Sequence, residues 1–371
     1  MRYKMADVVT EIKEKEDHPS ESKYERFVGL EHYVSGEIVI RNFGSTELLE
    51  SSMKVFRSGD ILVARRNVYL KRASVAMFDG LTSGDSIVLR AKNERVGRLL
   101  PFVLNTDAFW DFADQYSDGT MSKRLSPKTL MEYEFDLPDE SEQDELADIL
   151  WAAVDVKYSY QELLKQTDEL VKSQFIEMFY GKGYPVKTIG DVIDKNIIRV
   201  GKVFEKTDSI QYLDISSIDN TSKTVIGLTP YALADAPSRA QYVMKQNDIM
   251  YSTVRPNLQN FAINPYSDEN VVGSTGFCVL RCIGVTTGYM WGVINSIPFT
   301  EAMVNQASGA NYPAVTEKVV HAYEIPIPPE NEQNAYDELV RQTDKSKFEI
   351  KKSIENISEL IKSLMQQDFT N

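Results

Sequence analysis

The chain has 371 residues, more than one ordinary domain of about 100 to 200 residues, so we expect at least two folding units. Its composition, 42% hydrophobic and 26% charged, is typical of a globular protein, and no run reaches the roughly 18 apolar residues of a membrane helix. The N-terminal residues mix charges of both signs and contain no apolar block, so they predict no signal peptide. We therefore expect a cytoplasmic protein without a membrane partner.

The net charge of −14 by itself disfavours a nucleic-acid partner, but the charge is unevenly distributed. Residues 141–180 contain nine acidic and three basic residues, whereas residues 54–72 contain six basic residues against Asp60 alone. A local basic segment is therefore present, and the acidic total does not exclude DNA binding.

Two cysteines, Cys278 and Cys282, are too few for a disulfide framework and suit a reducing compartment. Their spacing resembles half of a zinc site, but no second Cys/His pair follows, and the three histidines, His18, His32 and His321, are scattered. We therefore expect no metal site. We interpret the cysteines as small apolar residues in and after a buried strand.

An internal duplication organises the chain. Four segments recur in the same order, with an offset that grows from 184 to 190 or 191 residues. The pairs are Met5–Val9 with Ile189–Ile193, Ser58–Leu62 with Gln246–Met250, Ile87–Arg90 with Cys278–Arg281, and Tyr133–Pro138 with Tyr323–Pro328. Glu-Gln at 142–143 then falls on Glu-Gln at 332–333, and each opens a long segment free of Pro and Gly. The sequence thus predicts two similar domains, each followed by a helix.

Within each domain the signals are short β runs bounded by Gly, Asn and Asp, such as 61–64, 87–89 and 277–280. Two further stretches, 102–112 and 290–304, look helical. The predicted fold class is therefore α+β, with two similar mixed, largely β domains separated by two long helices.

Both long helices carry a heptad pattern, with steps of four and three alternating along the chain. In the second helix the pattern falls on Tyr336, Val340, Thr343, Lys347, Ile350, Ile354, Ile357, Ile361 and Leu364. In the first it falls on Leu146, Leu150, Ala153, Lys157, Tyr160, Leu164, Thr167, Val171 and Gln174. A lysine occupies the same interior place in both copies, which favours pairing of the two helices with each other. A simple core helix is the alternative.

The first helix has a second stripe at strict spacing of seven, made of Ile149, Val156, Leu163 and Leu170. Its counterparts in the second helix are Leu339, Ser346, Ser353 and Leu360. One seam needs one partner, so the second stripe predicts a further protein surface, either a globular domain of this chain or another subunit.

Catalytic motifs are not found in the sequence. No G-x-x-x-x-G-K-[ST] occurs, and no G-x-G-x-x-G follows a strand, so phosphate loops for ATP or a dinucleotide are not predicted. Asn264-Pro265-Tyr266 lacks the second proline of an amine-holding methyltransferase loop and is better interpreted as a turn. Asp139, Asp155 and Lys157 fit the loose spacing of a metal-dependent nuclease, but the last two lie in the heptad helix rather than on a strand. The chain is therefore interpreted as a binding protein.

These features together resemble the specificity subunit of type I restriction-modification systems, over essentially the whole chain. The residues that carry the resemblance are the aromatic-acid-proline endings of the two domains, Tyr133–Pro138 and Tyr323–Pro329, with the Glu-Gln pairs that follow them. The end of the first helix, Leu170–Phe179, is similar to the family's helix end before its second domain.

The resemblance implies target-recognition domains at residues 1–140 and 185–330, with helical regions at 141–184 and 331–371. In the family, each domain reads half of a bipartite double-stranded DNA site, and the two helices pair antiparallel as a spacer on which two methyltransferase subunits assemble. A translocating restriction subunit can join them. Methylation, with S-adenosylmethionine as donor, and cleavage then belong to other chains, so we expect no catalytic residues or cofactor here. The methyltransferase subunits would pack on the second stripe.

Base readout needs Arg, Lys, Asn, Gln or Ser at a groove, while other Lys and Arg side chains hold phosphates. Two loops in each domain offer such residues: 65–72 and 118–124 in the first, and 253–260 and 308–313 in the second. The candidate DNA-binding residues are Arg65, Arg66, Asn67, Tyr69, Lys71, Arg72, Lys123, Arg124, Arg255, Asn257, Gln259, Asn260, Asn311 and Tyr312. Solvated loops without a DNA contact are the alternative. At the level of the whole chain, the alternatives are a metal-dependent PD-(D/E)xK-like nuclease acting alone and a coiled-coil scaffold without DNA.

Overall fold

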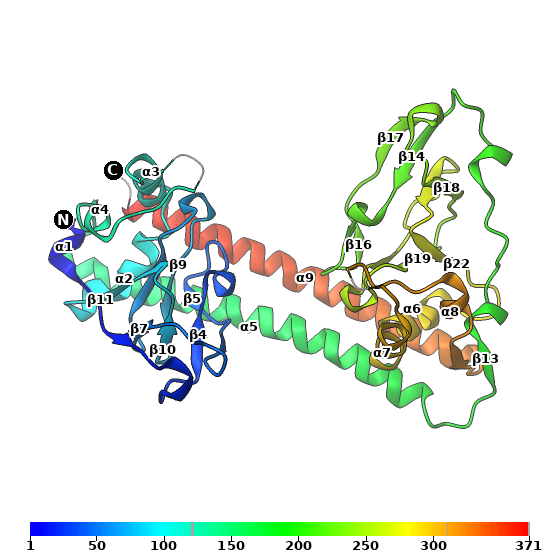
Figure 1. Cartoon of the computed structure of the whole chain (residues 1–371), viewed down its shortest axis with the longest axis horizontal. Helices are drawn as coiled ribbons and strands as arrows, with labels where there is room; N and C mark the ends of the chain where they lie inside the picture. The colour runs from blue at the N-terminus through cyan, green and yellow to red at the C-terminus, as the bar shows by residue number, and fades with distance from the viewer. Residues whose placement is uncertain (120–121, 310, 370–371) are drawn as a thin grey trace. The chain divides into compact units, whose positions relative to one another are not determined.

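The computed structural model describes residues 1–119, 122–309 and 311–369 of the chain. It divides into two compact units, unit 1 with Met1–Glu162 and Lys351–Asn371, and unit 2 with Leu163–Ile350. Each unit combines β-sheets and short helices with one part of each of the two long helices (Figure 1).

Unit 1 is built around two five-stranded sheets. One has the order β3 (Lys15–Glu16), β7 (Met53–Phe56), β10 (Gly80–Thr82), β4 (Arg26–Val28), β6 (Gly44–Ser45), and the other β2 (Val9–Glu11), β11 (Ser86–Ala91), β8 (Ile61–Ala64), β9 (Ala73–Ala76), β5 (Val39–Ile40). Strands β1 (Arg2–Lys4) and β12 (Glu134–Asp136) pair antiparallel and join the two ends of the domain. The helical elements are α1 (Met5–Val8), α2 (Glu94–Val103), α3 (Asp107–Gln115), α4 (Pro127–Met131), η1 (Pro19–Glu21), η2 (Leu30–His32) and η3 (Val68–Leu70).

Unit 2 repeats this plan with smaller sheets. A four-stranded sheet has the order β17 (Thr229–Ala232), β14 (Ser209–Leu213), β21 (Val271–Ser274), β18 (Ala240–Val243), and a three-stranded one β20 (Phe261–Ile263), β19 (Ile249–Ser252), β22 (Phe277–Leu280). Two antiparallel pairs are β13 (Val186–Thr188) with β23 (Glu324–Pro326), and β15 (Ile218–Asp219) with β16 (Thr224–Val225). The helical elements are α6 (Thr287–Asn295), α7 (Ile297–Gln306), α8 (Glu317–His321), η4 (Ile189–Asp191), η5 (Val200–Lys202), η6 (Ile215–Ser217), η7 (Leu233–Asp235) and η8 (Pro256–Leu258).

Strand β8 explains why the sequence shows short apolar runs without polar alternation. Ile61 and Val63 belong to the core that also contains the helices, whereas Leu62 and Ala64 belong to the core between the two sheets. Successive side chains of a strand point to opposite faces, so this sheet is buried on both sides. Strand β19 of unit 2 is also buried on both faces, because its neighbouring residues Ile249 and Met250 belong to different cores.

The two shorter helical stretches are helical, but each is broken into two helices. Thr106 begins α3 by accepting a hydrogen bond from the Phe109 amide at 3.2 Å, and Ser296 begins α7 by accepting one from Phe299 at 3.3 Å. These hydroxyls compete with the continuing helix for its backbone donors, so one helix ends and another begins. The predicted helical character of 102–112 and 290–304 is therefore confirmed, with a break between two helices in each stretch.

Helices α5 (Glu140–Phe179) and α9 (Glu330–Phe369) have 40 residues each. In unit 1, Leu150 near the start of α5 shares a core with Ile361 near the end of α9. In unit 2, Phe175 near the end of α5 packs on Tyr336 near the start of α9, with ring centroids 5.2 Å apart. The two helices therefore pair antiparallel, and the α+β fold class is confirmed (Figure 1).

All nine predicted seam positions on each helix are buried or half-buried, which confirms the heptad pattern. The two seam lysines have different partners. Lys347 donates to Asp168 of α5 at 2.7 Å, whereas Lys157 donates to Glu37 of the first domain at 2.8 Å. The recurring lysine thus supports helix–helix pairing at one position and domain–helix pairing at the other.

The repeated Glu-Gln motif has a structural role in both units. Gln143 donates through Nε2 to the carbonyl of Pro138 at 2.9 Å, and Gln333 donates in the same way to Pro328 at 2.8 Å. Both glutamines are buried. Each therefore ties the start of a long helix to the proline-containing end of the preceding domain.

None of the helices in the described part of the chain combines the length and apolar content that a membrane crossing requires.

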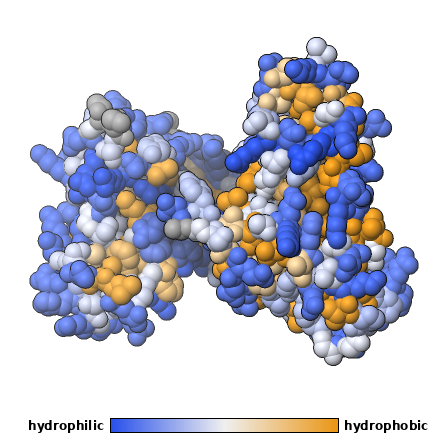
Figure 2. Space-filling view, turned by 45° about the vertical axis from the view of Figure 1, so that its right-hand side comes forward, coloured by the Kyte–Doolittle hydropathy of each residue, from blue (hydrophilic) through white to orange (hydrophobic). Residues whose placement is uncertain are grey.

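On the face shown in Figure 2, hydrophobic residues gather more densely over unit 2 than over unit 1, whose surface is mostly hydrophilic.

Candidate nucleic-acid interface

The two candidate loops of the first domain lie against each other. The amide of Asn67 donates to the carbonyl of Lys123 at 2.9 Å, and the amide of Leu125 donates to the carbonyl of Arg65 at 2.8 Å. The loops therefore form one backbone-linked surface. Thr120 and Met121, at the tip of the second loop, lie outside the described residues.

The second domain joins its two loops by equivalent bonds. The amide of Arg255 donates to the carbonyl of Pro313 at 2.7 Å, and the amide of Val315 donates to the carbonyl of Thr253 at 2.9 Å. Ala310 lies outside the described residues. The structure thus brings together, in each domain, two segments that the sequence placed far apart.

The first loop of each pair has the same unusual backbone. Asn67 and Lys71 flank η3 with φ of 55° and 47°, and Arg255 and Gln259 flank η8 with φ of 51° at both residues. Positive φ is uncommon for residues other than glycine and costs conformational energy. Because the four side chains differ while the backbone recurs, we interpret this turn as a fixed scaffold that presents variable residues.

Three arginines of the first domain surround the joint between its loops. Arg66 and Arg124 both form ion pairs with Asp85, and the Arg66 guanidinium lies 3.5 Å from its carboxylate. About half of each arginine side chain remains exposed. Arg65 is more enclosed and donates from Nε to the carbonyl of Leu125 at 3.2 Å. Burial and the neighbouring Arg124 charge lower the pKa of Arg65. Arg66 and Arg124 are therefore better placed for an outside ligand than Arg65.

The remaining cations of these loops are held by the domain itself. Lys71 donates to Asp107 at 2.6 Å and Lys123 to Asp114 at 2.6 Å. Arg72 donates to the carbonyls of Leu30, at 3.0 Å, and Arg66, at 2.9 Å. Their first role is therefore to shape the loops.

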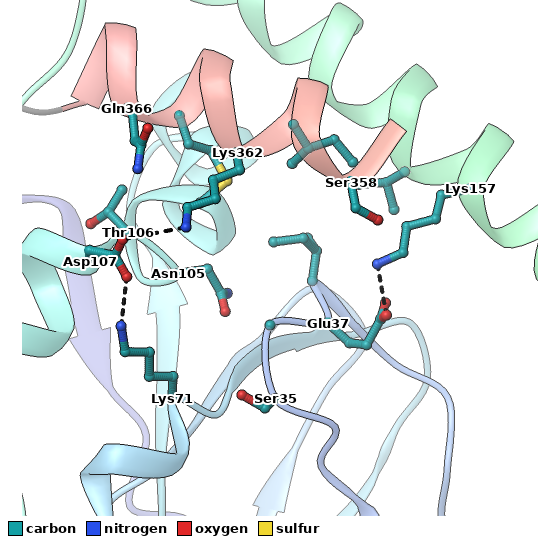
Figure 3. Close-up of a pocket in the computed structure, with 15 residues that line it drawn as sticks. Ser35, Glu37, Lys71, Asn105, Thr106, Asp107, Lys157, Ser358, Lys362 and Gln366 are labelled. Carbon is teal, nitrogen blue, oxygen red and sulfur yellow. Dashed lines mark hydrogen bonds and ion pairs between the residues drawn. The ribbon is translucent and has the colours of Figure 1, made fainter. Parts of the chain in front are cut away.

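Lys71 also lines a cavity of about 270 Å³ within unit 1 (Figure 3). There Lys71 and Lys362 of α9 both point toward Asp107, while Lys157 points toward Glu37. The ion pairs of Lys362 and Lys157 link the domain to the long helices, whereas the pair of Lys71 with Asp107 lies within the domain and leaves 42% of the Lys71 side chain exposed.

The second domain combines a cation with an aromatic ring at the same joint. The Arg255 guanidinium lies 4.8 Å from the ring centroid of Tyr312 and donates to the carbonyl of Asn311 at 3.3 Å. Asn257 is exposed, whereas Gln259 is half-buried and donates to Thr300 at 2.9 Å. Asn260 is half-buried as well. Arg255, Asn257, Asn311 and Tyr312 are therefore the candidate side chains most open to a ligand.

Each loop pair exposes one tyrosine, Tyr69 with 65% and Tyr312 with 69% of its surface accessible. Aromatic rings with this exposure can stack on bases or on sugar faces.

The second stripe of α5 is open along its length. Ile149, Val156, Leu163 and Leu170 expose 45%, 47%, 44% and 55% of their surface, respectively. These side chains are therefore accessible in the folded chain.

The nuclease constellation is not assembled. Asp155 and Lys157 are two residues apart on α5, a spacing that points side chains to different sides of a helix, and Lys157 is engaged by Glu37. Asp139 immediately precedes the helix. At a rise of about 1.5 Å per residue along the helix axis, it lies ~24 Å from Asp155. The three groups therefore do not converge on a common metal position.

Cys278 is buried and Cys282 is half-buried. Cys278 lies in β22 with its Sγ 3.4 Å from Nε2 of His321, and burial raises the pKa of its thiol. Burial also raises the pKa of Cys282 to about 12. Across the described residues, no group of three His, Cys, Asp or Glu side chains is arranged to hold a metal ion.

Asp85, which joins the two loops of the first domain, is not among the residues predicted from the sequence. It lies in the Ser-Gly-Asp turn before β11, far along the chain from both arginines that it binds. No local pattern marks such a residue, because its partners come together only in the folded domain.

No protein-family model matches the chain, and no curated protein matches it. The chain does match solved structures in fold. A chain from a type I restriction-modification system, whose structure addresses complex assembly and conformational transition, is 15% identical with a TM-score of 0.55 over 99% of this chain and 96% of that chain. The S subunit of a type I restriction-modification system from M. genitalium is 12% identical with a TM-score of 0.55, over 100% of this chain and 96% of that chain. Over nearly its whole length, this chain has the fold of the S subunits of type I restriction-modification systems, as its sequence resemblance predicts.

Proposed function

We propose that this chain is the DNA sequence-specificity subunit of a type I restriction-modification complex. In this proposal the target-recognition domains, residues 1–140 and 185–330, each read one half of a bipartite double-stranded DNA site. The chain itself performs no catalysis and acts in the cytoplasm, where DNA is accessible to it.

The observation that carries the proposal is one loop scaffold used twice with different side chains. At equivalent positions, Asn67 of the first domain corresponds to Arg255, and Ser122 corresponds to Tyr312. In both domains these two positions interact, since Ser122 donates to Asn67 at 3.0 Å and Arg255 packs on Tyr312. A constant backbone with exchanged side chains is what two domains need in order to read two different base sequences.

The side chains at these loops suit DNA. Arg66, Arg124 and Arg255 present guanidinium groups, which can bind guanine or phosphate in bidentate fashion, and Asn257 presents an amide, which can pair with adenine. Most cations of the loops, Arg66 and Arg124 included, have partners within their own domain, so the chain alone has few phosphate contacts to offer. Tight binding therefore requires basic surfaces of other subunits.

The helical regions, residues 141–184 and 331–371, act in this proposal as a spacer and a docking platform. The exposed stripe of α5 supports this role, because four apolar side chains at a spacing of seven suit a partner helix. We assign this surface to two methyltransferase subunits, which would bind S-adenosylmethionine and transfer its methyl group. A restriction subunit with translocase activity would complete the complex.

The test is to purify the chain with its methyltransferase subunits and to sequence the methylome of cells that express both. The expected result is methylation at two fixed half-sites separated by unread bases, and specific binding by the complex but not by the chain alone. Complexes that bind all sequences equally would favour a scaffold without DNA recognition. DNA cleavage by the isolated chain with Mg²⁺ would instead support the nuclease.

A further inference from the structure

Asp85 connects the two candidate loops of the first domain through their side chains. Its carboxylate accepts a hydrogen bond from Arg124 and lies 3.5 Å from the guanidinium of Arg66. About three quarters of the Asp85 side chain is covered, while 49% of the Arg66 and 48% of the Arg124 side chain stay exposed. The acid thus sits beneath two arginines whose outer edges face solvent.

The second domain has no counterpart of this cluster among its described residues. The carbonyl of Asp85 accepts the Arg65 amide at 2.9 Å, and the carbonyl of Gly276 accepts the Thr253 amide at 3.3 Å, which identifies Gly276 as the residue equivalent to Asp85. The backbone bridge between Arg66 and Arg124 likewise recurs between Val254 and Ala314. All three charged residues of the first domain are therefore replaced together by uncharged ones on the same backbone.

A carboxylate at this place has opposite effects on two properties of a DNA-binding surface. It repels phosphates, so it weakens general attraction to DNA. It also restricts the rotamers of two long side chains, so less conformational entropy is lost when they meet a particular base edge. An acid that weakens attraction and orients donors favours discrimination between sequences over affinity.

We propose that Asp85 is a positioning residue that determines specificity at the half-site read by residues 1–140, by holding Arg66 and Arg124 as one unit. The proposal rests on the function proposed above and adds to it the residue that selects among sequences. Arg66 and Arg124 make the contacts, and Asp85 acts through them.

The experiment uses the complex of the full chain with its methyltransferase subunits. Binding is measured to the cognate site, to sites altered in one half at a time, and to DNA without the site. The variants are Asp85→Asn, which keeps the shape and removes the charge, and Asp85→Glu, which keeps the charge. Asp79→Asn is the matched control, because it removes the same charge from the same domain at an exposed acid that faces Arg57 at 3.5 Å.

We expect Asp85→Asn to lower discrimination at one half-site by about 10-fold, to leave the other half-site unchanged, and to bind DNA without the site more tightly. Asp85→Glu should restore part of the discrimination, and Asp79→Asn should match the unaltered complex. A purely structural role for Asp85 predicts weaker binding to every DNA instead, and that result would overturn the proposal, as would unchanged discrimination. An unaltered complex without sequence preference would refute the proposed function itself, and this inference with it.

Discussion

The carboxylate of Asp60 accepts two hydrogen bonds from the guanidinium of Arg90, at 2.7 and 2.8 Å. The second domain repeats the pair as Asp248 and Arg281, at 2.8 and 2.6 Å. Both carboxylates are 1% exposed, and each also accepts a backbone amide three residues before it at 2.8 Å. The recurring Asp and Arg of the sequence repeat are thus partners, and they connect the start of one strand with the end of its neighbour.

Because these acids are buried, removing one partner should strongly destabilise the fold. We expect Asp60→Ala or Asp248→Ala to lower the free energy of unfolding by about 3 kcal/mol, since each leaves a guanidinium and an amide without their acceptor. Urea denaturation followed by circular dichroism measures this. Asp148→Ala, at an acid whose side chain is 72% exposed, is the control and should cost less than about 1 kcal/mol. Equal losses in all three variants would contradict a special role for the buried pairs.

The loop assignment predicts that single substitutions change one half-site each. We expect Arg66→Ala to alter recognition of one half and Arg255→Ala or Asn257→Ala the other, each costing about 1 to 3 kcal/mol where a bidentate base contact is lost. Methylomes of the variants measure this, and the two arginine variants serve as controls for each other. Arg65→Ala should act on the same half as Arg66→Ala, through the bond from Arg65 to Leu125. If both halves change together in any variant, the division of labour between domains is wrong.

The exposed stripe predicts a matched pair of variants on the two long helices. Leu170 of α5 is 55% exposed, and its counterpart Leu360 of α9 is 50% exposed. We expect Leu170→Asp to weaken association with the methyltransferase subunit by about 100-fold or more, because it places a charge in an apolar contact. Leu360→Asp should leave association unchanged, and both variants should keep their helical circular dichroism. Co-purification and size-exclusion chromatography measure the effect, and equal behaviour of the two variants would assign the docking surface elsewhere.

Helix length predicts the spacing of the DNA half-sites. The 40 residues of α5 correspond to ~60 Å of helix, longer than the ~34 Å of one DNA turn. Four residues inserted after Thr167 add ~6 Å, about two base steps, and the heptad pattern should absorb the insertion as a local stutter. We expect a methylome with the same two half-sites and a longer spacer. The original spacer in that methylome would mean that the helices do not set the separation.

Local pattern determined much of this architecture. The heptad positions of both long helices were predictable because a helix repeats its environment every three or four residues, so burial leaves a periodic trace in the sequence. The duplication was visible because Asp60 with Arg90, and Asp248 with Arg281, occupy corresponding places in the two copies. Short runs such as Ile61–Ala64 predicted strands because they are buried on both faces.

Only the tertiary structure decided which residues meet across the chain. Lys157 and Lys347 occupy equivalent seam positions, yet one binds Glu37 and the other Asp168, because the neighbouring elements differ. The exposure of Leu163 and its stripe could not be predicted, since it depends on what the folded domains leave uncovered. Asp85 lies between Arg66 and Arg124 because the turn before β11 lies beside both loops. Sequence periodicity carries no information about contacts over such separations.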